Sequence, residues 1–284
     1  MKRFLSLISP KSLTVLTIIV SVTLLTSCNK QDELDNDHML NLNLFMDTPI
    51  SRTTTDNIWS GGEQVQVSIN DGTAVTFIAA QNGTLTPLNP IYWQNASQNI
   101  SARAWHPASW TFPADQSGGL QPADFIFAST VTGIMFSNYL SKPLVFQHRL
   151  AKITVNLMAG TDISSVAGAT VSFFGYTVGS PDTSDTGNGV ISGSGNGWIT
   201  PQNSSDDTYA ALLIPRDMMG IPFVKIIIAG TYYLYTPAVG QATLKQGMAY
   251  SFNITVHKTR LDVEVVDGIE WSDSSEYDVA PNHS

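Results

Sequence analysis

The sequence has a single cysteine and few charged residues, and both shortages exclude classes of protein. Only 13% of the 284 residues are charged, about half the ~25% of an ordinary soluble domain. Fourteen basic residues against 23 acidic ones give a net charge of −9, without the basic patch that nucleic acid binding requires. One cysteine permits neither an internal disulfide nor a cysteine-rich zinc site. Stability must therefore come from burial of apolar side chains.

The residues that are abundant indicate a β-protein. The apolar fraction is 43%, with 21 glycines and 14 prolines, which argues against disorder and against a coiled coil. Ser, Thr, Asn and Gln supply most of the polar residues. This composition is typical of a turn-rich, all-β globular protein.

Residues 1–27 are typical of a lipoprotein signal peptide. A basic start is followed by the uncharged run LTVLTIIVSVTLL at residues 13–25, shorter than the ~20 residues that span a membrane and suited to a signal sequence. Small residues then precede Cys28, as in a bacterial lipobox. The position of Cys28 therefore predicts lipid attachment to its thiol. Two or more acyl chains would anchor the protein stably in the membrane. The alternative is an ordinary signal peptide with an incidental cysteine.

The polar segment 28–36 reads as a tether between the lipid and the folded protein. A lysine followed closely by Asp32 and Glu33 resembles the surface-export signal of Bacteroidales lipoproteins. We therefore expect a precursor anchored by its lipid in the cell outer membrane and exposed at the surface.

Beyond the tether, apolar and polar residues alternate in short runs, for example over residues 64–69, 152–157 and 249–256. Such alternation is typical of strands with one buried face. No apolar run has helical spacing, and turn-forming residues separate the runs. Many short strands predict β-sandwiches or closed sheets.

A domain boundary is expected near Lys142 and Pro143, where a half rich in Trp and Pro gives way to a new alternating run. We predict an N-terminal β-sandwich over residues 37–142 and a C-terminal one over 143–284.

The order of several short motifs resembles the fimbrillin family of Bacteroidales surface proteins over nearly the whole chain. The motifs are SRTT at 51–54, IWSGGEQVQV at 58–67, WHP at 105–107, LVFQHRLAKITV at 144–155, LKQGMAYSFNITV at 244–256 and IEW at 269–271. The resemblance implies two β-sandwich domains of the transthyretin-like, Greek-key type. It also implies a structural, anchor or tip component of cell-surface fimbriae, with other fimbrial subunits as partners and a role in adhesion to a host or bacterial surface ligand. No cofactor is implied.

In polymerising fimbrillins a protease cuts after an arginine behind the first strand, and a strand of the next subunit fills the vacated groove. Carried over to this sequence, the displaced strand carries Leu40, Leu42, Leu44 and Met46. The cut falls between Arg52 and Thr53. The candidate donor is the stretch 260–271, in which Leu261, Val263 and Val265 share a face.

Filling the vacated groove would be β-strand addition, which satisfies open backbone groups and apolar pockets together. Two alternatives stay open: Arg52 is an ordinary loop residue, or the last strands pair within their own domain and the subunit caps a fimbria.

Enzymatic chemistry has little support in the sequence. The five histidines lack metal-site spacing, and no G-x-S-x-G elbow occurs. His148 is interpreted as an interdomain residue. Asp182, Asp185 and the neighbouring glycines could gather oxygens around Ca²⁺, but without the spacing of a calcium loop they favour a solvated turn. We expect neither metal nor enzymatic activity.

The tryptophans support one other function. Trp93, Trp105 and Trp110 lie close together in a Pro- and Ser-rich region, and exposed indole faces stack on sugar rings. A glycan-binding surface lipoprotein is therefore the alternative to a fimbrial subunit, although core or interdomain packing is the favoured interpretation of this cluster.

Overall fold

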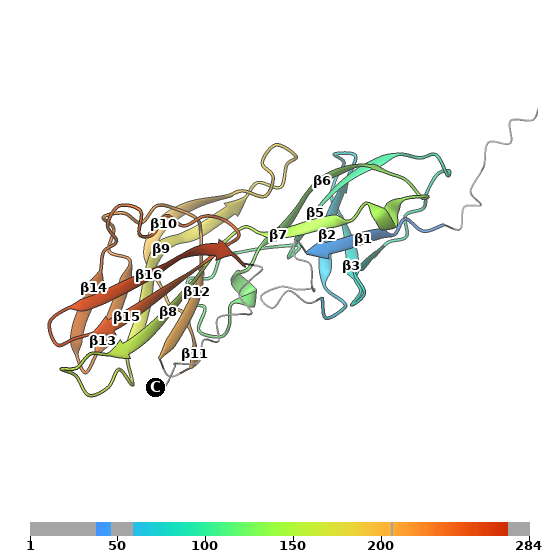
Figure 1. Cartoon of the computed structure of the whole chain (residues 1–284). Helices are drawn as coiled ribbons and strands as arrows, with labels where there is room; N and C mark the ends of the chain where they lie inside the picture. The colour runs from blue at the N-terminus through green and yellow to red at the C-terminus, as the bar shows by residue number, and fades with distance from the viewer. Residues whose placement is uncertain (1–37, 47–58, 206, 272–284) are drawn as a thin grey trace, which may run out of the picture.

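The computed structural model describes residues 38–46, 59–205 and 207–271. Almost all of the ordered structure is strand, with two 3-10 turns, η1 (Gln121–Ala123) and η2 (Tyr139–Ser141), which confirms the all-β prediction. In the described part of the chain no helix is long and apolar enough to cross a membrane. Cys28, Arg52 and Thr53 lie outside the described residues. Figure 1 shows two lobes arranged end to end.

Seven strands build the N-terminal lobe in the order β1-β4-β3-β2-β5-β6-β7, and β7 pairs with β1 so that the sheet closes on itself. This differs from the expected sandwich of two separate sheets, because β1 has a neighbour on each side. The strands are β1 (Leu42–Met46), β2 (Gln64–Ile69), β3 (Val75–Ala79), β4 (Thr84–Pro87), β5 (Ile100–His106), β6 (Ile126–Ile134) and β7 (Leu144–His148).

The C-terminal lobe has two sheets, ordered β10-β9-β13-β14 and β11-β12-β8-β15-β16. One apolar cluster, centred on fully buried residues such as Phe173, Phe223 and Phe252, fills the lobe. The strands are β8 (Ala151–Ala159), β9 (Thr170–Pro181), β10 (Ile191–Ile199), β11 (Gln202–Ser205), β12 (Thr208–Leu213), β13 (Val224–Ile228), β14 (Thr231–Tyr235), β15 (Met248–Val256) and β16 (Leu261–Glu270).

The two lobes meet later in the chain than composition suggested. β7 lies beyond the expected boundary near Pro143, yet it pairs with β1 and β6 of the N-terminal lobe. The next strand, β8, pairs with β12 and β15 of the C-terminal lobe. The chain therefore passes between lobes across residues 149 and 150, in the middle of the alternating run that marked the start of the second unit.

A hairpin of the C-terminal lobe also contacts the N-terminal lobe. The β9–β10 turn reaches toward β6 in Figure 1. The Ser129 and Thr130 hydroxyls donate hydrogen bonds to Asn188 and Asp185 of that turn. Gly189, with a φ of +72°, packs so closely on Phe127 that an added Cβ would lie 2.4 Å from the ring. The two lobes are thus joined by the chain crossing, by this docked hairpin and by the β5–β6 connection, in which the Gln116 side chain bonds to the Leu212 backbone.

Candidate assembly site

The N-terminal segment closes the sheet of its lobe with few backbone pairs. β1 pairs antiparallel with β4 at Leu42 and Asn43, and parallel with β7 at Leu44, Phe45 and Met46. Just before β1, the Leu40 amide donates to the Ile91 carbonyl at 2.7 Å. Removal of β1 would leave one edge of β4 and one edge of β7 without a partner, and such edges are templates for another strand.

The alternating pattern of this segment predicts its buried face correctly where side chains are described. Leu40 and Leu42 are 2% and 1% exposed and belong to the core of the N-terminal lobe. Burial of a leucine contributes about 1.5–3 kcal/mol, so the two together contribute about 3–6 kcal/mol. The side chains of Leu44 and Met46 lie outside the described set, although both residues lie within β1.

Trp59, the first residue of the described segment 59–205, is anchored in the N-terminal lobe. Its indole is 2% exposed and packs edge-on against Phe146 and His106, each with ring centroids 5.6 Å away. Residues 47–58, which include Arg52, therefore connect two anchored points, β1 and Trp59. A cut within this connection would leave β1 held without a covalent link to Trp59, and the described contacts that remain include its hydrogen bonds and the burial of Leu40 and Leu42.

The predicted donor segment forms strand β16 and pairs with β15 through eight residue pairs. It is an edge strand, with a neighbour on one side only. Leu261, Val263 and Val265 are half-buried against the core of the C-terminal lobe. In the isolated chain this segment is therefore part of its own sandwich.

An ionic cluster holds the turn that leads into β16. His257 Nδ1 lies 2.9 Å from Asp162 and His257 Nε2 lies 3.0 Å from Asp262. The Arg260 guanidinium donates two hydrogen bonds to Asp262, at 3.0 and 3.1 Å. Those bonds hold the pKa of Asp262 below its usual range, and the charge of His257 adds to this.

Trp271, at the end of β16, lies in a polar cluster between the lobes. Its indole stacks on His148 at 3.7 Å between centroids, and the His148 ring lies 3.0 Å from the buried carboxylate of Asp124. The neighbouring Arg149 is 2% exposed and faces the ring of Phe127. Burial lowers the pKa of Arg149. The interdomain position expected for His148 is where the structure places it.

Sequence reasoning missed Asp124, the partner of His148, because no local pattern links residues so far apart. It also missed the buried position of Arg149. The signal available for Arg149 was its place beside His148 within an otherwise apolar alternating run.

The three tryptophans considered for glycan binding do not form one surface. Trp93 is 1% exposed and lies in the core of the N-terminal lobe, so it presents no ring face to a ligand. Trp110 packs on Phe112 and Phe125 and donates its indole N–H to the Ala123 carbonyl. Trp105 stacks on Phe127 and lines a cleft between the lobes.

The carboxylates of the acidic turn considered for Ca²⁺ accept hydrogen bonds from protein groups. Asp182 accepts the Ser184 amide, and Asp185 accepts the Thr130 hydroxyl. Among the described residues, no group of three or more His, Cys, Asp or Glu side chains is placed to hold a metal ion.

The family comparison covers most of the chain. A family model described as fimbrillin-like matches residues 51–270. No curated protein matches the chain significantly.

Solved structures share its fold. A proposed cell adhesion protein from Bacteroides uniformis matches with a TM-score of 0.67 and 17% identity, over 84% of this chain and 100% of that chain. Another such protein, from Bacteroides ovatus, matches with a TM-score of 0.59 and 15% identity, over 82% of this chain and 97% of that chain. The tip fimbrial protein Mfa3 from Porphyromonas gingivalis, truncated at its C-terminus, matches with a TM-score of 0.50 and 10% identity. The match covers 82% of this chain and 99% of that chain. At these identities the likeness shows the fold alone.

Proposed function

The chain belongs to the fimbrillin-like family, and on that premise we propose that it is a component of cell-surface fimbriae that assembles by strand exchange. In this proposal β1 is removed by a cut between Arg52 and Thr53, and a strand of another subunit takes its place. The observation that carries the proposal is the position of β1, which closes the sheet of the N-terminal lobe through two residue pairs with β4 and three with β7.

Physical chemistry supports β1 as the exchangeable element. While residues 47–58 are intact, β1 stays at high local concentration beside its groove. After the cut it can diffuse away, and the freed groove offers two strand edges together with the pockets of Leu40 and Leu42. An incoming strand with alternating apolar residues would restore both the hydrogen bonds and the burial.

The donor we propose is the segment around Leu261, Val263 and Val265. Its edge position means that release breaks the pairing with one neighbour, β15, and not with two. Its release must also overcome eight residue pairs and the cluster of His257 and Asp262. A subunit that keeps β16 in its own sheet can accept a strand without donating one, which is the behaviour of a tip or cap.

We also propose that lipid on Cys28 holds the precursor in the outer membrane, with the folded lobes outside the cell. In this arrangement the cut after Arg52 releases the lobes from residues 28–52 and from the lipid. The same cleavage thus frees the subunit and opens its groove.

An Arg-specific protease tests the assembly proposal. Purified precursor cut after Arg52 should form SDS-resistant ladders, whereas an Arg52→Gln variant treated in parallel should stay monomeric. A protein that is cut cleanly at Arg52 and stays monomeric would contradict self-assembly.

Synthetic peptides distinguish the donor. Cut protein freed of β1 should bind a peptide of residues 260–271, and a peptide of residues 38–46 should compete with it. If the β1 peptide rebinds and the β16 peptide does not, the subunit accepts strands but β16 is not the donor.

A further inference from the structure

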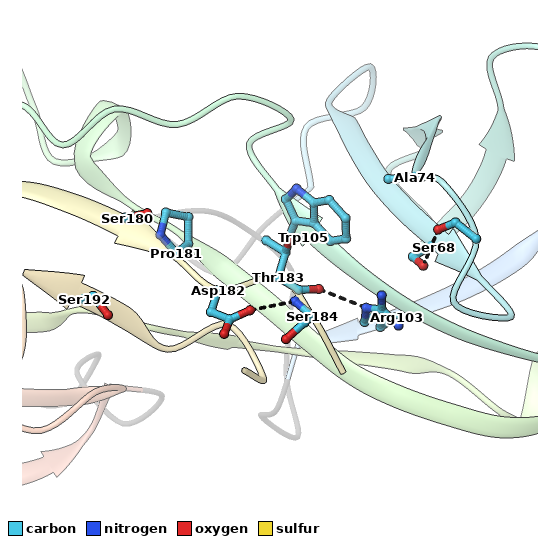
Figure 2. A pocket seen from close by; sticks show the side chains of 11 residues that line it. Ser68, Ala74, Arg103, Trp105, Ser180, Pro181, Asp182, Thr183, Ser184 and Ser192 are labelled. Atoms are coloured by element: carbon cyan, nitrogen blue, oxygen red, sulfur yellow. Dashed lines mark hydrogen bonds between the residues drawn. The ribbon is translucent and has the colours of Figure 1, made fainter. Parts of the chain in front are cut away.

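A polar cleft lies between the two lobes, away from β1 and β16. It has a volume of about 680 Å³, within the ~300–1,000 Å³ range of ligand sites. The turn between β2 and β3 and the strand β5 form one wall, and the β9–β10 hairpin forms the other. Figure 2 shows Trp105 between these walls, with Ser68 and Ala74 on one side and Ser180 and Ser192 on the other.

Two hydroxyls of the hairpin wall, those of Ser180 and Ser192, are free for a ligand among the described residues. Ser180 and Ser192 are directly opposite each other in the β9–β10 register, and both are exposed. Neither hydroxyl makes a hydrogen bond with the described residues, whereas Ser68, on the opposite wall, donates its own to the Gly72 carbonyl. Each free hydroxyl can donate and accept, which matches the hydroxyl groups of a polyol.

Trp105 supplies the apolar element of the cleft. Its indole lies nearly parallel to the ring of Phe127, at 13° with centroids 6.4 Å apart, so the core side of the ring is supported. The indole also lines the cleft. A flat aromatic surface edged by polar groups suits a ligand that has an apolar face and a polar rim.

The charges of the cleft do not favour an ionic ligand. Arg103 already donates to the Thr183 carbonyl at 2.9 Å and pairs with Asp71. Asp182 accepts hydrogen bonds from the Ser184 hydroxyl and amide, which lower its pKa, so its carboxylate stays ionised at neutral pH. A nearby carboxylate repels anions, and the charge of Arg103 is already paired with that of Asp71. The carboxylate can still accept hydrogen bonds from neutral hydroxyls.

We propose that this cleft binds a neutral oligosaccharide, with a pyranose ring against Trp105 and its hydroxyls bonded to Ser180, Ser192 and Asp182. Pyranoses present C–H groups on one face and hydroxyls around the edge, which is the complement of this lining. The site retains one of the three tryptophans first considered for glycans and replaces the other two with side chains of the hairpin. It goes beyond fimbrial assembly and does not depend on it.

Calorimetric titration of the uncut, monomeric protein tests the proposal, so that failure of strand exchange has no bearing on the result. The probes are cellotriose, maltotriose, mannotriose, galactotriose and chitotriose, with trigalacturonic acid as the charged comparison. At least one neutral probe should bind, with a Kd of about 0.1–1 mM because the cleft is open, and trigalacturonic acid should not.

Two variants localise the binding. Ser192→Gln places bulk inside the cleft and should weaken binding at least about tenfold, or roughly 1.4 kcal/mol. Ser194→Gln is the matched control, since Ser194 is exposed on the same strand but does not line the cleft, and it should stay within about twofold. Asp182→Asn should weaken binding, because a charged acceptor forms the stronger hydrogen bond.

The proposal is overturned if no neutral probe binds at millimolar concentration, or if trigalacturonic acid binds more tightly than all of them. It is also overturned if the Ser192→Gln and Ser194→Gln variants bind equally well.

Discussion

At the scale of single residues, the buried carboxylate of Asp124 is a sensitive point. One oxygen lies 3.0 Å from the His148 ring, while Oδ2 is buried and has no partner among the described residues. Asp124→Asn would place an amide N–H group at the site of that unpartnered oxygen and weaken the bond to His148. Leaving a buried donor unsatisfied costs about 1–3 kcal/mol. We therefore expect the free energy of unfolding to fall by about this amount and the urea midpoint to fall with it.

Asp207→Asn is the control for this substitution, because Asp207 is exposed and its carboxylate makes no hydrogen bond with the described residues. It should leave the urea midpoint unchanged. Equal midpoints for the two variants would show that the contact between Asp124 and His148 contributes nothing to stability.

The sequence predicts the burial of single side chains correctly where apolar residues alternate with the two-residue period of a strand. Leu40 and Leu42 are buried as their alternation requires. It fails where burial depends on distant partners: Trp93 is in the core, while Trp105, in the same region of sequence, lines a cleft. Composition and spacing are similar for the two tryptophans, and only the fold separates them, since Trp93 lies in the connection between β4 and β5 and Trp105 lies on β5.

At the scale of elements, the burial of Leu42 in β1, and of Leu40 just before it, holds this segment in place. Leu42→Ala removes buried apolar volume from the closed sheet, and such truncations cost about 2–5 kcal/mol. Asn43→Ala removes the side-chain hydrogen bond to the Leu140 carbonyl, worth about 0.5–1.5 kcal/mol. Thermal unfolding should rank the two variants in that order. The reverse order would mean that hydrogen bonding, and not burial, holds β1.

The turn before β16 should respond to acid. The pKa of Asp262 is lowered in the folded chain by the hydrogen bonds from Arg260, so this contact stabilises the fold above the ordinary aspartate range near pH 4 and is lost as the pH falls below it. Hydrogen-exchange protection of the β16 amides, corrected for intrinsic rate, should therefore fall between pH 6 and about pH 3. Asp262→Asn should show reduced protection at pH 6 and a smaller further change. Identical pH profiles for the two proteins would exclude this role.

The sequence predicts most strands but not their neighbours. Pairing of β1 with β7 joins segments that are about a hundred residues apart, and no local pattern encodes such a contact. For the same reason the expected boundary near Pro143 falls before β7, which joins the first lobe. The alternating run across β7 and β8 is continuous in sequence, although its two halves belong to different sheets.

At the scale of the whole molecule, the docked β9–β10 hairpin is one of the contacts that join the two lobes. Arg103, Ser129 and Thr130 of the N-terminal lobe all bond to its turn. A fimbrial subunit that transmits tension along a polymer benefits from such additional contacts, because the crossing at residues 149–150 alone would act as a hinge. The hairpin also forms one wall of the cleft, so lobe orientation and ligand binding share one structural cause.

Gly189→Ala tests this connection. The added Cβ would lie 2.4 Å from Phe127, at a backbone φ of +72° that favours glycine. Gly240→Ala is the matched control, since Gly240 has a φ of +79° and nothing within 4 Å of an added Cβ. Both variants should lose about 1–2 kcal/mol to the left-handed conformation, but only Gly189→Ala should displace the hairpin. Small-angle X-ray scattering should then show a larger maximum dimension for Gly189→Ala alone. If both variants scatter like the wild type, the hairpin does not fix the lobes, and their orientation must rest on other contacts, such as the cluster of Asp124, His148 and Trp271 or the bonds between Gln116 and the Leu212 backbone.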